Sequence, residues 1–393
     1  MKLADHALPF RSRSGFSLVE LLVYMAILAV LLTLIVTSFT QTQRRSIQQS
    51  DIAETQIETG MGLGLLHSNL ENAGFGLPWA FPVNFGGYNE PDLANPNINI
   101  IPPNAVPAAL TSVVNDAGDF IGSDLLAIRA TNVIRAANGQ RWGYLGNNAA
   151  HQADVQSAGM GNEQLTAADL IIALRTGNSG DPTAFRSLVT DGAGKYAFPA
   201  SAGELAGIAP PPTPNDPDGA RLLLYGIADH AAPTSRPFNR TDYFIANGAN
   251  VPPVNVPAHC APGTGVLVKT DLTQRDFDTP QPVVDCVADF QVVYHLAGAA
   301  APVDAHGLNG LDAEHIRNQL LGVRCYILIH EGGIDRSYTY SNNPVINVGE
   351  MDANGNLAAG RAFDVRKLAG IGGDWAHYRW KVVNVVVSPQ NLR

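Results

Sequence analysis

The sequence GFSLVELLVYMAILAVLLTLIVTSF of residues 15–39 decides how this chain is built. Almost all of it is apolar, and a helix of that length can cross a lipid bilayer. The residues before it are polar and carry Lys2, Arg11 and Arg13, which favours an N-terminus on the cytoplasmic side. We therefore expect one helix across the inner membrane, with the rest of the chain in the periplasm.

The residues around this stretch predict where the chain is cut. A secretory signal is cleaved after its apolar part, beside small residues, whereas here Arg44 and Arg45 follow. The stretch also holds Glu20, whose burial in lipid is costly unless a cation pairs with it. If cleavage falls between Gly15 and Phe16, the new amino group lies four residues before Glu20, within reach of a neighbouring subunit. The alternative is an incidental acid favoured by the dipole at the start of a helix.

The run from Gly15 to Glu20, behind a short basic leader and ahead of an apolar helix, closely resembles the signal of type IV prepilins and pseudopilins. The resemblance implies that a prepilin peptidase cuts after Gly15 and methylates Phe16. It also implies that Glu20 neutralises the N-terminal amine of an adjacent subunit during filament assembly. The predicted segments are a leader at 1–15, a transmembrane half-helix at 16–39, an amphipathic half-helix at 40–76 and a head at 77–393.

The helix is predicted to continue beyond the membrane. Apolar residues recur at i,i+4 spacing, at Ala53, Ile57, Met61 and Leu65. Glycines at 60, 62 and 64 predict a local kink or a close helix contact. Gly and Pro residues at 73–78 predict its end.

The chain has 393 residues, 46% of them hydrophobic, which allows a large head. Residues 79–118 show no sustained period and predict an extended loop. Short apolar runs between turn residues predict strands at 124–129, 169–175, 221–227, 242–246, 265–269, 287–296, 323–330 and 378–387, and 312–321 has helical spacing. The strands at 323–330 and 378–387 are expected at the centre of the sheet, covering the long helix. The fold class is α+β: a long N-terminal helix packed on an antiparallel, pilin-like sheet with large loop insertions.

Three further segments look like the PilW family of minor pilins: NAGFG at 72–76, GGIDRSY at 332–338 and VVNVVVSPQNL at 382–392. This resemblance implies a low-copy pilus subunit that helps to initiate assembly within a minor-pilin tip complex. The implied partners are other minor and major pilins and a PilY-type tip adhesin at the cell surface. Two alternatives remain: a J-type minor pseudopilin of type II secretion, whose head would be smaller, and a membrane-tethered enzyme or periplasmic binding module.

The three cysteines, Cys260, Cys286 and Cys325, have no CxxC or CxxCH spacing, which argues against a zinc ribbon or a haem attachment site. In a periplasmic head one disulfide is expected. Cys260 and Cys286 are the favoured pair because both are predicted near strand ends in one region. The alternative is three unpaired thiols, with Cys325 buried in a strand.

No pattern in the sequence indicates catalysis or cofactor binding. GxSxG and HExxH are absent, and the ten histidines are dispersed. The stretches 215–219 and 352–356 place oxygen ligands at alternate positions, but neither completes a calcium loop, and both predict turns. A net charge of -10 would repel a phosphate backbone. We expect no enzyme, no metal or other cofactor, and no nucleic-acid partner.

Overall fold

The computed structural model describes residues 17–90, 106–116, 118–134, 136–147, 153–158, 164–177, 185–209, 221–227, 236–248, 253–273, 278–308 and 311–392. The chain forms two compact units, Met1–Asp51 and Ile52–Arg393. We call them the N-terminal unit and the head unit.

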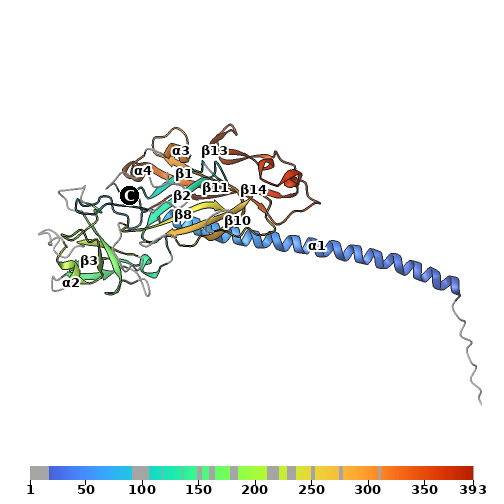
Figure 1. Ribbon diagram of the computed structural model, residues 1–393, viewed down its shortest axis with the longest axis horizontal. Coiled ribbons are helices and arrows are strands. Elements are labelled where there is room, and N and C mark those ends of the chain that lie inside the picture. The colour runs from blue at the N-terminus through green and yellow to red at the C-terminus, as the bar shows by residue number, and fades with distance from the viewer. Residues whose placement is uncertain are drawn as a thin grey trace, which may run out of the picture. The chain divides into compact units, whose positions relative to one another are not determined.

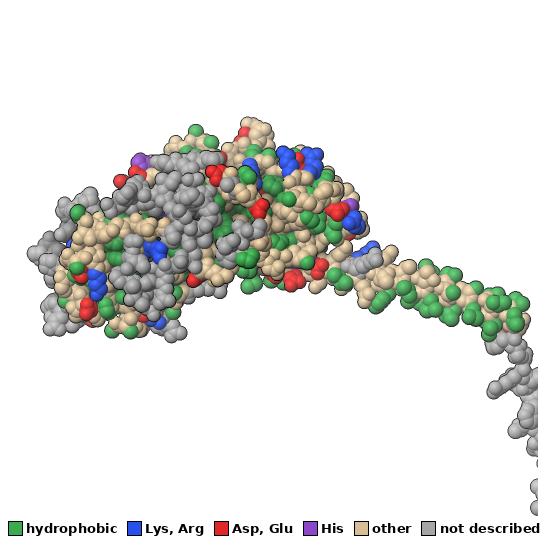
Figure 2. All heavy atoms as spheres, in the orientation of Figure 1, with side chains coloured by type: hydrophobic (Ala, Val, Ile, Leu, Met, Phe, Trp, Pro, Cys, Tyr) green, Lys and Arg blue, Asp and Glu red, His purple; other side chains and the backbone are tan. Residues whose placement is uncertain are grey.

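Helix α1 (Leu18–Glu71) is continuous (Figure 1). In the N-terminal unit its large apolar side chains, from Leu18 to Phe39, are exposed, and Figure 2 shows them along the helix surface. By length and composition this helix can cross a membrane. So much apolar surface is unfavourable in water, so lipid or other apolar helices are its natural surroundings.

The head unit contains a seven-stranded sheet in which every neighbouring pair is antiparallel. Its order is β1 (Leu110–Val114), β2 (Asp124–Ala130), β8 (Asn239–Ala246), β9 (Gly265–Leu272), β10 (Gln281–Leu296), β11 (Leu320–Glu331) and β14 (Arg379–Val387). Leu66 and Leu70 of α1 are fully buried in one core with Leu126 and Ile128 of β2. The alternate residues of β2 point to the opposite face, as strand geometry requires, and join a separate core. The predicted α+β class, a long helix packed on antiparallel strands, is therefore confirmed.

A second sheet of five strands has its own core. Its order is β4 (Ala153–Ser157), β3 (Trp142–Asn147), β7 (Leu222–Gly226), β5 (Leu170–Arg175) and β6 (Ala197–Pro199), and helix α2 (Ala202–Ala206) contributes Leu205 to that core. Phe75, which follows α1, makes edge-to-face contacts with Tyr225 at 5.1 Å and Trp142 at 6.2 Å between ring centroids. These aromatic contacts join the end of the helix to the second sheet.

The remaining described elements are short. They are η2 (Ala137–Gln140), α3 (Ala305–Leu308), α4 (Ala313–Gln319), the hairpin β12 (Val345–Met351) and β13 (Leu357–Asp364), η5 (Val365–Lys367) and η6 (Gly372–His377). Asp352 closes the hairpin by accepting hydrogen bonds from the backbone N–H groups of Asn354 and Asn356, at 2.9 and 2.7 Å. The turn predicted at 352–356 is thus confirmed, whereas 215–219 lies outside the described residues.

Two predictions about the sheet were wrong. Strand β14 was expected at the centre, yet it lies at the edge beside β11, because pairing order follows from long-range contacts and not from apolar content. Residues 79–118 were expected to form a loop only, yet Leu110–Val114 is strand β1, whose register is set by pairing with β2. In addition, no sequence pattern predicted β3, β4, β6, β12 and β13 or the second sheet.

Candidate functional site

The N-terminal segment carries the residues that the sequence singled out. Gly15 and Phe16 lie outside the described residues. Glu20 lies in the first turn of α1 and is exposed on an otherwise apolar surface. No hydrogen-bond donor or cation pairs with its carboxylate within the described part of the chain. A carboxylate in this position is costly in an apolar environment unless a cation pairs with it.

A glycine sets how closely α1 approaches the sheet in the head unit. A Cβ atom at Gly62 would lie 2.0 Å from the carbonyl oxygen of Val283 in β10, whereas Gly60 and Gly64 have open space around them. Only Gly62 is therefore required for the contact. The close contact predicted for this glycine-rich part of α1 is with a strand, and the helix continues through it.

A groove opens beside this contact. Its lining includes the side chains of Glu58, Met61 and Leu65 of α1 and Asp285 of β10. Burial, together with the neighbouring Glu58, raises the pKa of the Asp285 carboxyl. The groove therefore combines apolar surface with two acids that repel each other.

The structure joins Cys260 and Cys286 in a disulfide, with 4.9 Å between their Cα atoms. His259 offers a ring nitrogen within 4.8 Å of the two sulfurs, but disulfide sulfurs are not the thiolates that bind metals. Cys325 is a buried free thiol, and burial raises its pKa, which makes it unreactive. The chemistry of all three cysteines is therefore that of structural residues.

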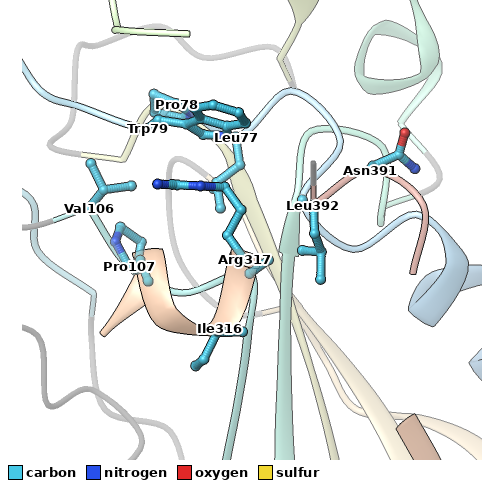
Figure 3. A pocket seen from close by; sticks show the side chains of 12 residues that line it. Leu77, Pro78, Trp79, Val106, Pro107, Ile316, Arg317, Asn391 and Leu392 are labelled. Atoms are coloured by element: carbon cyan, nitrogen blue, oxygen red, sulfur yellow. The ribbon is translucent and has the colours of Figure 1, made fainter. Parts of the chain in front are cut away.

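A pocket in the head unit holds an arginine that the sequence patterns did not single out (Figure 3). Arg317 of α4 lines this pocket, with its guanidinium carbon 4.2 Å from the ring centroid of Trp79. Arg186 lies 5.6 Å from the same ring and donates to the carbonyl oxygens of Gly74 and Asn391. Burial lowers the pKa of both arginines. The stacking on Trp79 connects α4 to the segment that follows α1, and the hydrogen bonds of Arg186 connect that segment to the C-terminal residues.

A network of buried charges surrounds Glu90 in the head unit. Its carboxylate accepts hydrogen bonds from Arg129 at 2.8 and 2.7 Å and from Arg240 at 2.6 Å, and also from the Tyr88 hydroxyl. Arg240 also donates two bonds of 2.6 Å to Asp242. The network therefore balances two cations with two anions, as burial requires. No local motif marks the network, because the two arginines lie 39 and 150 positions from Glu90.

Comparisons with known proteins bear on the N-terminal segment. Residues 10–36 match the prokaryotic N-terminal methylation motif, and this match includes Gly15, Phe16 and Glu20. Neither a curated protein nor a solved structure matches the chain. This motif is the processing signal of type IV pilin-like and pseudopilin-like proteins, which implies cleavage by a prepilin peptidase and association with other pilins. The chain therefore carries a type IV prepilin-like signal on a helix able to anchor it in a membrane.

Proposed function

We propose that this chain is a minor pilin of the PilW type, which helps to initiate type IV pilus assembly and acts by assembly, not catalysis. The observation that carries the proposal is the methylation motif at 10–36. It is supported by Glu20, which has no partner among the described residues and lies on an exposed apolar helix. The segments at 72–76, 332–338 and 382–392, which resemble PilW, support the finer assignment.

The energetics of the helix support a role in a filament. In the membrane its apolar surface contacts lipid, and in a fibre the same surface contacts other helices. Glu20 is costly in either place without a cation, and the methylated amine at Phe16 of a neighbouring subunit would supply one. Entry into the fibre therefore keeps the apolar surface covered and neutralises the acid.

The partners and location follow from this role. A prepilin peptidase would act on the cytoplasmic side of the inner membrane, and the head would lie in the periplasm before assembly. In the fibre the chain would contact other minor and major pilins and a PilY-type tip adhesin. A J-type pseudopilin of type II secretion shares the signal, but such pseudopilins have heads smaller than the head unit of this chain, the 342 residues of Ile52–Arg393.

The first test is the mass and N-terminal sequence of the protein from cells with and without the prepilin peptidase. We expect a chain that begins at methylated Phe16 only when the peptidase is present. A chain that keeps residues 1–15, or is cut beyond Phe39, would contradict the proposal and favour a tethered binding module. Deletion of the chain should then reduce surface pili and leave exoprotein secretion intact; the reverse result would indicate a pseudopilin.

A further inference from the structure

The edge strand β14 has one side with which no described strand pairs. Its register with β11 runs without a shift from Val323 opposite Val387 to Glu331 opposite Arg379, along all 9 residues of the strand. No other strand follows it in the sheet order. One side of β14 is therefore fully paired, and no strand among the described residues pairs with the other side, which we call the free edge.

The hydrogen bonds of β10 show which groups face that edge. Tyr294 exchanges two backbone hydrogen bonds with Val303, of 2.7 and 2.9 Å, so its N–H and C=O point away from β11. Tyr294 lies opposite Val323 of β11. Because these two residues do not bond to each other, the N–H and C=O of Val323 point to the other side of β11, toward Val387 of β14. Val292 agrees, because its N–H points away from β11 to the Asp124 carboxylate at 2.7 Å.

Alternation along an antiparallel strand assigns the rest of β14. The odd-numbered residues bond to β11, and the even-numbered ones direct their N–H and C=O groups outward: Trp380, Val382, Asn384 and Val386. Among the described residues, none supplies a hydrogen-bond partner to these outward backbone groups. The side chain of Asn384 is exposed, and that of Val386 is 53% exposed.

Natural proteins protect such edges with charges, prolines, bulges or short strands. Strand β14 is long, contains no proline and has no bulge. Its two cations lie at one end and are already paired: Arg379 with Asp335 at 2.6 Å and Lys381 with Glu331 at 3.0 Å. The stretch VVNVVV at 382–387 contains no charge, proline or bulge.

We propose that β14 accepts an extended strand from a different subunit of the same filament, which adds one strand to the seven-stranded sheet. Its backbone would bond to the four outward residues. Its alternate side chains would lie beside Val383 and Val385 on the face that packs toward α1, so they should be apolar. On the opposite face they would lie beside Asn384 and Val386, where polar side chains fit.

This inference rests on the proposed function, which indicates why the partner is a different subunit. Two copies of this chain could pair β14 with β14 in antiparallel fashion only across a two-fold axis. Such a contact is closed and cannot continue along a polar fibre whose subunits all point one way. An unlike strand from a neighbouring subunit is free of this restriction.

Amide hydrogen exchange at single-residue resolution tests the free edge directly. In the full chain in detergent, we expect the amides of Trp380, Val382, Asn384 and Val386 to exchange about 100-fold faster than those of Val383 and Val385. In fibres enriched through a tag on this chain, the four fast amides should become slow. Slow exchange in the isolated chain, or fast exchange in fibres, would overturn the proposal.

A matched pair of substitutions at Asn384 tests whether the edge is used. Asn384→Pro removes one outward N–H and leaves the pairing with β11, whereas Asn384→Ala keeps that N–H. We expect both variants to be folded and cleaved, but Asn384→Pro to enter fibres about tenfold less, as for one lost hydrogen bond. Equal entry of both variants would overturn the proposal. If Asn384→Pro does not fold because proline restricts the strand backbone, hydrogen exchange of the wild-type chain in fibres decides the proposal.

The outcomes separate this inference from the proposed function. If the wild-type chain is not cleaved or enters no fibre, both fail together. If the wild-type chain assembles and Asn384→Pro assembles equally well, only the inference fails. A disulfide between two copies of a Val383→Cys variant in fibres would show that a second copy covers the edge, and would overturn the choice of an unlike subunit.

Discussion

Replacement of Glu90 by glutamine should destabilise the head unit more than any other isosteric change in its buried charge network. Burial by itself would raise the pKa of Glu90, but Arg129 and Arg240 outweigh that effect and bring it down to about 2. The ordinary value is 4.5, so the difference corresponds to about 3 kcal/mol of stability. Glu90→Gln removes this contribution and leaves two buried guanidinium groups to share one anion.

The sign of the pH dependence follows from the lowered pKa. A carboxyl group whose pKa is lower in the folded protein contributes its full stability above the unfolded value of 4.5. That contribution is lost as the pH falls from about 5 toward 2. Wild-type protein should therefore lose stability over this range, and Glu90→Gln should lose about 3 kcal/mol less over the same range.

The assay is urea unfolding of the full chain in detergent, followed by tryptophan fluorescence at pH 7 and at pH 3. At pH 7 we expect the midpoint of Glu90→Gln to fall by roughly 1 M urea, for a slope near 3 kcal/mol/M. Asp242→Asn is the matched control. Burial raises the pKa of Asp242 in spite of Arg240, so a neutral side chain there should cost less. The exposed Glu71→Gln should change the midpoint hardly at all.

Two results would refute this reasoning. The first is a Glu90→Gln midpoint at pH 7 equal to that of the wild type. The second is a larger loss for Asp242→Asn than for Glu90→Gln, since that order would place the critical anion at Asp242.

Three further predictions concern the helix, the disulfide and assembly. Gly62→Ala should destabilise the head unit by about 2 kcal/mol in urea unfolding, because its Cβ would lie 2.0 Å from a backbone oxygen of β10. The control Gly60→Ala has open space around it and should stabilise the head unit by up to about 1 kcal/mol. Equal effects of the two substitutions would contradict the close contact. Replacing both Cys260 and Cys286 by serine should lower the free energy of unfolding by about 3 kcal/mol, for a sequence separation of 26 residues. An unchanged urea midpoint under oxidising conditions would exclude a stabilising role of the disulfide. Glu20→Gln should leave cleavage and membrane insertion unchanged and reduce entry into fibres at least about tenfold, because a buried amine without its acid costs about 3 kcal/mol. Immunoblots of sheared fibres measure the amount of the chain that enters them. Normal entry would exclude the pairing of Glu20 with an N-terminal amine.

The N-terminal segment could be interpreted from the sequence because its properties are local. Membrane crossing depends on a continuous apolar run, and the processing signal depends on neighbouring residues, so both can be recognised in the order of the amino acids. The turn at Asp352 was predictable for the same reason, since its hydrogen bonds reach only two and four residues ahead. Most strands of the large sheet were also found, because alternation and apolar runs are local signals.

Strand order and the buried charges could not be predicted in this way. The apolar content of β14 suggested a central strand, but whether a second neighbour pairs with it depends on how the whole chain folds. Glu90 meets Arg129 and Arg240 only because β2 and β8 are adjacent in the sheet, and no spacing in the sequence encodes that pairing. The sequence alone determined the anchor and its signal, which need only adjacent residues. The tertiary structure decided that β14 lies at the edge of the sheet and which charges are buried together, because these two features depend on contacts between residues far apart in the chain.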